Sequence, residues 1–180
     1  MTHSTLEMYN FHVWANDVII ERLKELPEEI YHKEIQSGFS SVSQILTHIY
    51  LTDYAWFEII QGKSMNEAME TTNQLKKEVE LKSLNEMKEI FLNLSERYKI
   101  LLNSQNDMDV LLIVDNPYAG QLETSISETL IHVVTHGSYH RGNIATMLRQ
   151  MGHTSVMQDY GLYLYSKERK INVGRASKHS

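Results

Sequence analysis

The chain has 180 residues, a formal net charge of −6 at neutral pH and an isoelectric point near 5.8, which argue against nucleic acid as the main partner because phosphate binding requires a basic face. No apolar run approaches the roughly 20 residues that span a bilayer, and the first residues lack the pattern of a signal peptide. Cysteine is absent, which excludes disulfides and thiolate ligands, and we expect a cytoplasmic protein.

Four segments carry apolar residues at spacings of three and four, the pattern of a helix that buries one face. They cover about residues 4–26, 41–61, 83–102 and 125–151. Each begins with a serine followed three residues later by Glu or Gln, the arrangement of a capping box. Pro27 ends the first segment, and Gly62 and Gly152 follow the second and the fourth as expected for C-caps. The sequence therefore predicts four helices.

Two connectors separate these helices. Residues 63–82 are rich in Glu, Lys, Asn and Thr, and we expect a surface excursion with room for a short solvated helix. Residues 110–114 are a β-prone Val-Leu-Leu-Ile-Val run, and the turn-forming residues 115–120 follow them. A small hairpin or loop insert is therefore predicted before the last helix.

After the fourth helix, residues 159–165 form a short apolar piece that should pack on the other helices. From Lys167 onward the sequence is basic and polar. The expected organisation is one domain over residues 1–166, followed by a polar, mobile tail over residues 167–180.

Two imidazoles lie four residues apart in the fourth segment, at His136 and His140. Side chains at i and i+4 share one helical face, one turn apart, and are close enough to hold a single metal ion. Both histidines fall on the apolar face, where a buried imidazole without a partner costs free energy. The spacing alone leaves two interpretations open: metal ligands, or core histidines satisfied by hydrogen bonds.

Three further histidines bear on this pair. His48, at the edge of the apolar stripe of the second helix, could face the fourth helix and supply a third nitrogen. Three neutral imidazoles leave one position open, as in a catalytic zinc site. His132 lies four residues before His136, but successive steps of four drift around a helix, so we favour a supporting or groove role for it. His12 lies beside the main stripe of the first helix and is predicted at the surface or in an interface.

The fourth helix contains the sequence His-Val-Val-Thr-His-Gly-Ser-Tyr-His-Arg-Gly-Asn-Ile over residues 132–144. It resembles the signature of the DinB (damage-inducible) family, His-x-x-x-His-x-x-x-His-Arg-Gly-Gln-Ile, with Asn143 in place of the usual glutamine. Residues 39–56 are similar to the segment that carries the first ligand of that family. Residues 14–16, Trp-Ala-Asn, are similar to the opening helix of the family.

The resemblance implies an all-α four-helix bundle with up-down-down-up connectivity, and a divalent ion held by His48, His136 and His140 with water completing the site. We expect nickel or zinc, since three imidazoles suit these metals better than magnesium or calcium. Relatives of this fold include thiol S-transferases that use bacillithiol or mycothiol. The resemblance therefore implies a metal-dependent transfer of a soluble thiol, such as bacillithiol, to an electrophile. We also expect a homodimer that acts on small molecules.

Three residues near the histidines have alternative interpretations. Arg141 could anchor an acidic group of the substrate or thiol, but an ion pair with a carboxylate such as Asp53 or Glu128 is the favoured interpretation. Asp53 could instead fix the tautomer of a ligand imidazole. Gly137 should let the fourth helix approach a neighbour closely. The alternatives to a transferase are a metal-dependent hydrolase and a non-enzymatic metal-binding protein of the damage or stress response, and the sequence does not separate them.

Overall fold

The computed structural model describes the backbone of residues 2–176 and the side chains of residues 4–168. This part of the chain is predominantly helical, with one two-stranded antiparallel sheet. In chain order the elements are α1 (Thr2–Lys24), α2 (Glu29–His32), α3 (Val42–Ile60), α4 (Met65–Glu80), α5 (Leu84–Asn103), β1 (Leu111–Asn116), β2 (Gly120–Ser125), α6 (Ile126–Gln150) and α7 (Tyr160–Ala176).

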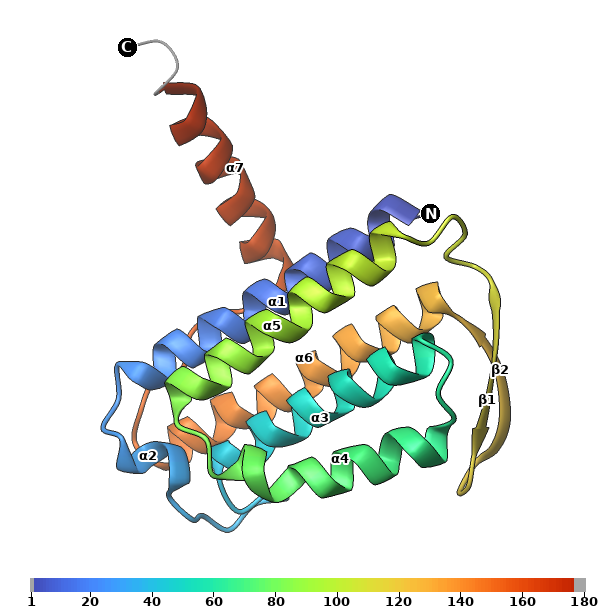
Figure 1. Cartoon of the computed structure of the whole chain (residues 1–180). Helices are drawn as coiled ribbons and strands as arrows, with labels where there is room; N and C mark the ends of the chain where they lie inside the picture. The colour runs from blue at the N-terminus through green and yellow to red at the C-terminus, as the bar shows by residue number, and fades with distance from the viewer. Residues whose placement is uncertain (1, 177–180) are drawn as a thin grey trace.

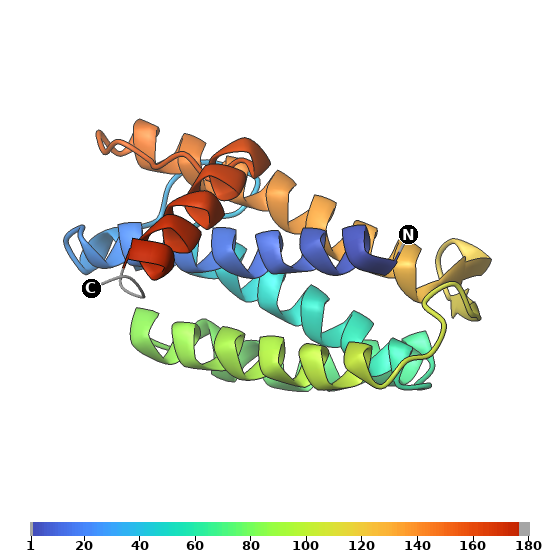
Figure 2. The ribbon, with the colours of Figure 1, turned by 90° about the horizontal axis from the view of Figure 1, so that it is seen from above.

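The four helices predicted from the apolar spacing are α1, α3, α5 and α6, and each end lies within two residues of its predicted position. They pack around a shared core, in which α6 contacts α1 and α3, and α5 contacts the same two helices. In Figure 1, α1 and α6 run in one direction and α3 and α5 in the other. Seen from above, α1 lies between α5 and α6 (Figure 2). The core includes Ile45, Leu46 and Ile49 of α3, all fully buried.

Serine caps set the starts of three of these helices. The Ser83 side chain accepts a hydrogen bond from the backbone of Glu86, whose carboxylate accepts one from the Ser83 backbone, a complete capping box. Ser41 and Ser125 also accept a hydrogen bond from the backbone amide three residues on. Gly62 follows α3 with a φ of 100°, a left-handed conformation that glycine adopts without strain.

The polar connector after α3 forms the 16-residue helix α4, so the helix for which the prediction left room is present and fills most of the connector. Ser64 and Glu67 begin this helix with a complete capping box. Its polar composition reflects a wide exposed face, while Met65, Ala68 and Val79 are buried. The helix packs on α3 and on β1, and it therefore forms a layer outside the four long helices (Figure 1).

The predicted hairpin before the last long helix is confirmed. The strands β1 and β2 pair antiparallel, in a register that places Leu111 opposite Ser125 and Asn116 opposite Gly120. The Asn116 side chain accepts hydrogen bonds from the backbone amides of Tyr118 and Ala119, which closes the turn. The hairpin lies at the end of the helices where α6 begins.

The apolar piece after α6 packs on α1, as predicted. Tyr163 of α7 is buried against Phe11 and Trp14 of α1. The helix then continues through Lys167, where we expected the polar tail to begin, and projects away from the other helices (Figure 1). Residues 177–180 of that expected tail lie outside the described residues.

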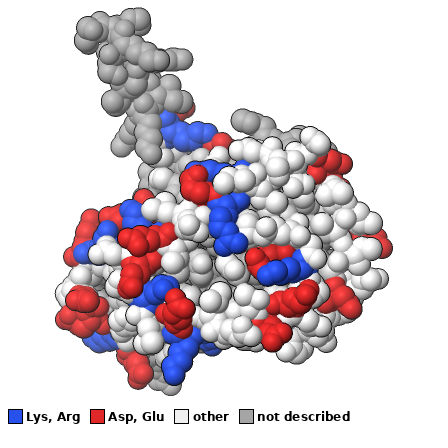
Figure 3. Space-filling view, in the orientation of Figure 1, with Lys and Arg blue, Asp and Glu red and all other residues white. Residues whose placement is uncertain are grey.

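The surface carries a mixture of charges. On the face seen in Figure 3, acidic side chains are interspersed with basic ones, and no continuous basic area is visible among the described side chains of that face. None of the helices between residues 2 and 176 combines the length and the apolar character that a membrane span requires.

Candidate metal centre

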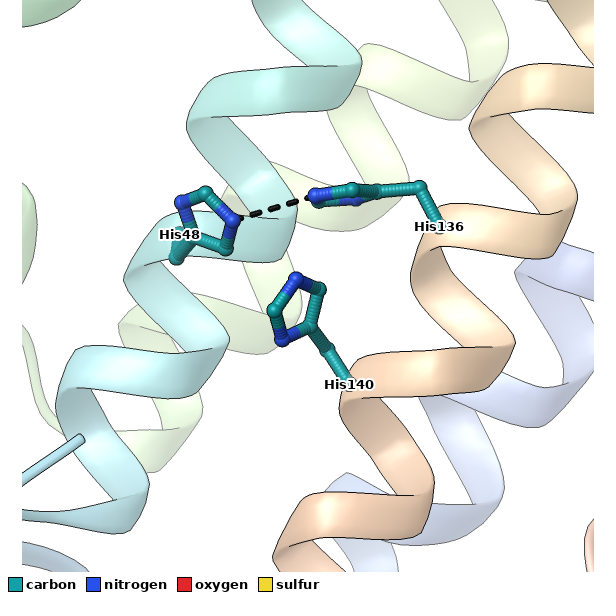
Figure 4. Close-up of side chains that lie close together, drawn as sticks. All are labelled: His48, His136 and His140. Carbon is teal, nitrogen blue, oxygen red and sulfur yellow. Dashed lines mark hydrogen bonds between the residues drawn. The ribbon is translucent and has the colours of Figure 1, made fainter. Parts of the chain in front are cut away.

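The three predicted ligands lie together between two neighbouring helices. His48 comes from α3, and His136 and His140 come from successive turns of α6 (Figure 4). The Nε2 atoms of His48 and His136 are 3.0 Å apart, and one ring nitrogen from each of the three residues lies within 4.8 Å of the others. Two nitrogens bound to one tetrahedral zinc ion lie about 3.3 Å apart, for Zn–N bonds of about 2.0–2.1 Å. The cluster could therefore hold a divalent metal ion.

Aromatic rings pack against two of the three histidines. Phe39, in the loop before α3, packs against the rings of both His48 and His140, and Tyr139 packs edge-on against His140. His140 is only 7% exposed, whereas His48 and His136 are half-buried. The site thus combines polar donor atoms with a partly apolar wall.

Burial keeps the three imidazoles uncharged. The pKa of His136 is lowered to about 3, mainly by burial and to a smaller extent by the neighbouring His140 and His48. The pKa of His140 is lowered to about 4, mainly by burial and to a smaller extent by His48. Burial and the ammonium group of Lys76 lower the pKa of His48. At neutral pH each ring therefore has a free electron pair, which metal binding requires.

The Nδ1 atoms of His136 and His140 are buried and have no hydrogen-bond partner among the described residues. Histidine ligands usually donate this N–H group to a carboxylate, a backbone carbonyl or water. The expectation that Asp53 fixes the tautomer of a ligand is wrong, because its carboxylate contacts His12 instead, with 2.7 Å between Asp53 Oδ2 and His12 Nε2.

His12 is the residue near the site that the sequence analysis misplaced. It is only 1% exposed, so the predicted surface or interface position is wrong. Arg141 Nη1 donates to His12 Nδ1 at 3.2 Å and to Asn16 Oδ1 at 2.8 Å. A Cβ atom at Gly137 would lie 2.3 Å from His12 Cε1, which confirms the close approach predicted there. The missing side chain at Gly137 was the sequence signal for a large group packed against this turn.

Arg141 faces α1 and is 1% exposed. Its hydrogen bonds go to Asn16 and His12 and to Ser138 Oγ at 3.0 Å, so the predicted ion pair with Asp53 or Glu128 is wrong. Burial lowers the pKa of Arg141 to about 10, and it stays cationic at neutral pH. This buried position gives no support to the expected anchoring of a substrate by Arg141.

His132 lies one turn before His136 and outside the cluster of three. Its ring packs edge-on against Trp56, with centroids 5.1 Å apart, and lies 5.8 Å from the ring of His136. It therefore borders the cluster from the side of Trp56.

A cavity of about 370 Å³ adjoins His48, and we call it the α3–α4 cleft. On each helix its lining residues recur at spacings of three and four, so each wall is one helical face. The residues used below are Thr47, His48, Leu51 and Trp56 of α3, and Met69, Lys76 and Glu80 of α4. The volume falls within the range of small-molecule sites, about 300–1,000 Å³.

Comparison with known proteins gives matches over nearly the whole chain. Residues 1–172 match the DinB family. The chain is 48% identical over 165 residues to the protein DinB of Bacillus subtilis strain 168, an alignment that covers 92% of this chain and 96% of the relative. The crystal structure of a DinB-like protein from Bacillus cereus has a TM-score of 0.63 and is 15% identical, covering 86% of this chain and 95% of that one. At such low identity this second likeness shows the fold alone.

Proposed function

This chain belongs to the DinB family, and on that basis we propose that it is a metal-dependent thiol S-transferase. The observation that carries the proposal is the convergence of three uncharged imidazoles beside the α3–α4 cleft. Three protein nitrogens leave a coordination position of a zinc or nickel ion open to a substrate, and the cleft offers that substrate a binding surface. The proposal includes the up-down-down-up four-helix bundle of the family for the four long helices.

His48, His136 and His140 are the residues that would hold the ion. When bound, such an ion lowers the pKa of a thiol ligand, as it does for water. The low pKa values of His136 and His140 keep their donor nitrogens available near neutral pH. Phe39 and Tyr139 pack against the ring of His140.

The chain has no cysteine, so the reacting sulfur comes from a soluble thiol, and bacillithiol is the first candidate. The thiol loses its proton to solvent, its sulfur forms a bond to an electrophilic carbon, and the leaving group departs with the bonding electrons. Because such a thiol is dissolved in the cytoplasm, we place the proposed reaction there.

We also propose a homodimer, with small molecules rather than nucleic acid or membranes as its ligands. The apolar side chains of Leu111 and Ile131 are exposed at the border of one shallow surface hollow. Covering them with a second copy would remove apolar area from water. Light scattering on the full chain would test this, and a monomer at micromolar concentration would contradict it.

The transferase is tested on untagged protein loaded with zinc or nickel. Bacillithiol, glutathione and coenzyme A are supplied separately with a chromogenic electrophile. We expect a rate above the uncatalysed one with a particular thiol, a requirement for metal, and a fall by orders of magnitude in His136→Ala. His132→Ala serves as the control and should retain most of the activity.

Other outcomes identify the alternatives. If no thiol reacts and none perturbs the visible spectrum of a cobalt-substituted site, the transferase is excluded, and stoichiometric metal would then indicate a binding protein of the damage response. Hydrolysis of the electrophile without thiol would indicate a hydrolase.

A further inference from the structure

We propose that the α3–α4 cleft binds an acidic small-molecule substrate, with its carboxylate on Lys76 and its apolar part against Trp56 and Met69. The inference deepens the proposed function. It rests on that function in one respect, because only the proposed reaction identifies the bound molecule as a substrate that reacts beside His48. The binding itself requires only the residues of the cleft.

The cleft has a polar end and an apolar end. The helices α3 and α4 run in opposite directions, so the end of α4 lies beside the start of α3 (Figure 1). Lys76 and Glu80 lie toward that end of α4 and line the cleft together with His48. The start of α4, with Met69, lies toward Trp56. Lys76 lies seven positions after Met69, about 10 Å along a helix at 1.5 Å per residue. A ligand that spans the cleft is therefore a short molecule with a charge at one end.

Lys76 supplies that charge. Its side chain is 61% exposed, and its ion pair with Glu80, one turn further along α4, is at the long distance of 4.0 Å. An exposed pair of this kind contributes little, so the ammonium group can exchange this partner for a ligand carboxylate. Lys76 and His48 line the same cleft, so an anion held by Lys76 lies near the metal centre. Among the residues that line the cleft, the charge of Glu80 balances that of Lys76. A divalent ion bound at the three histidines would therefore give the cleft a net positive charge.

Thr47 provides an independent observation at the same end. Its side chain is 1% exposed, lines the cleft, and its Oγ1 has no hydrogen-bond partner among the described residues. A buried hydroxyl without a partner costs free energy, so an occupant that accepts this hydrogen bond is favoured. A carboxylate has several acceptor sites and can contact a hydroxyl and an ammonium group together.

The other end suits an apolar group. Trp56, Leu51 and Met69 are half-buried rather than buried, so each presents part of its side chain to the cleft. The indole ring of Trp56 is held edge-on against His132. A pocket with mostly apolar walls and a few polar groups is the usual form of a small-molecule site, in which the polar groups fix the orientation.

The experiment uses Trp56 as the reporter. The chain has two tryptophans, and Trp14 lies in a separate cluster with Phe11 and Tyr163. The substitution Trp14→Phe therefore makes Trp56 the single tryptophan of the protein. The probe is 8-bromooctanoate, whose terminal bromine quenches indole fluorescence on contact. We expect saturable quenching in metal-free and in nickel-loaded protein. The isomer 2-bromooctanoate, with bromine beside the carboxylate, should bind but quench less.

Charge variants test the anchor. Lys76→Met should weaken binding of the probe about tenfold or more, as expected for the loss of a charge-assisted hydrogen bond, and Lys76→Arg should restore most of it. The matched control is Lys77→Met, because Lys77 is exposed on the same helix and does not line the cleft. Absence of saturable quenching, equal quenching by the two isomers, or an equal loss in Lys76→Met and Lys77→Met would each overturn the proposal.

The outcomes separate this inference from the transferase. Quenching that depends on Lys76, in a protein that conjugates no thiol, would keep the site and exclude the enzyme. Thiol conjugation of an acidic electrophile with an unchanged KM in Lys76→Met would keep the enzyme and exclude the site.

Discussion

Replacing Gly137 by alanine should destabilise the protein, although alanine is the better helix former. The new Cβ atom would lie 2.3 Å from His12 Cε1, 2.6 Å from His12 Nδ1 and 2.8 Å from Arg141 Nη1. Carbon atoms in van der Waals contact are about 3.5–4.0 Å apart, so the ring of His12 would have to retreat by roughly 1 Å.

That retreat is costly because His12 is held on several sides. It contacts Asp53 at 2.7 Å and Asn16 at 3.0 Å, and it is 1% exposed. Overpacking a core costs about 1–3 kcal/mol, and a buried hydrogen-bonding group left without its partner costs about 1–3 kcal/mol. The gain in helix propensity from Gly to Ala offsets about 1 kcal/mol of this. The expected net change in the free energy of unfolding is a loss of about 1–5 kcal/mol.

Gly142→Ala is the matched control, about 1.4 turns further along α6. A Cβ atom at Gly142 would meet nothing within 4 Å, so only the propensity gain of up to about 1 kcal/mol remains. Urea unfolding followed by helical circular dichroism should therefore show opposite shifts for the two variants. If Gly137→Ala were as stable as the parent, or shifted in the same direction as Gly142→Ala, His12 would not pack against this turn.

About one divalent ion per chain should bind, and His48→Ala, His136→Ala and His140→Ala should each abolish stoichiometric binding, whereas His132→Ala should keep most of it. Elemental analysis of untagged protein measures this, and full occupancy after loss of both His136 and His140 would refute the site. Chelation at neutral pH should leave the helical circular dichroism intact, because each fully buried large apolar side chain contributes roughly 1.5–3 kcal/mol without the metal; loss of the helical signal would make the ion structural. In metal-free protein the free energy of unfolding should decrease as the pH falls from about 6.5 toward 3. The reason is that the pKa of His136 is about 3 in the folded state, so the unfolded chain takes up the proton first. His136→Gln should flatten this dependence in urea titrations across that range, and an unchanged slope would contradict the assignment.

The buried polar cluster explains how α6 is oriented. Arg141 directly follows the candidate ligand His140, and its guanidinium donates to Asn16 of α1. Asp53 of α3 contacts His12 of α1, and the hydroxyl of Tyr98 on α5 donates to the Asp53 backbone at 2.7 Å. These hydrogen bonds connect all four long helices and limit rotation of α6 about its axis. Such rotation would move His136 and His140 away from His48.

Local periodicity was enough to determine the long helices and two of the three candidate ligands. Each apolar stripe and each serine cap involves residues within a few positions of one another, so the sequence specifies them without reference to the fold. His136 and His140 share a face for the same reason, because the i,i+4 geometry of a helix is local. The hairpin was also determined locally, by a β-prone run followed by turn residues.

Only the tertiary structure decided what lies against these elements. On α1, apolar residues occupy more than one face, since Phe11 packs under α7 while Tyr9 packs in the main core. His12 lies between those faces, and it is buried where α6 approaches closely at Gly137 and Asp53 of α3 contacts its ring.

The same holds for α4, whose apolar residues Met65, Ala68, Leu75 and Val79 share one helical face but are outnumbered by polar residues. Its packing on α3 creates the cleft beside His48, and His48 itself joins the other two ligands only through the packing of α3 on α6. Spacing along a chain determines which residues share a helical face. Which faces meet depends on contacts between segments far apart in sequence, and a single sequence does not encode these contacts as a local pattern.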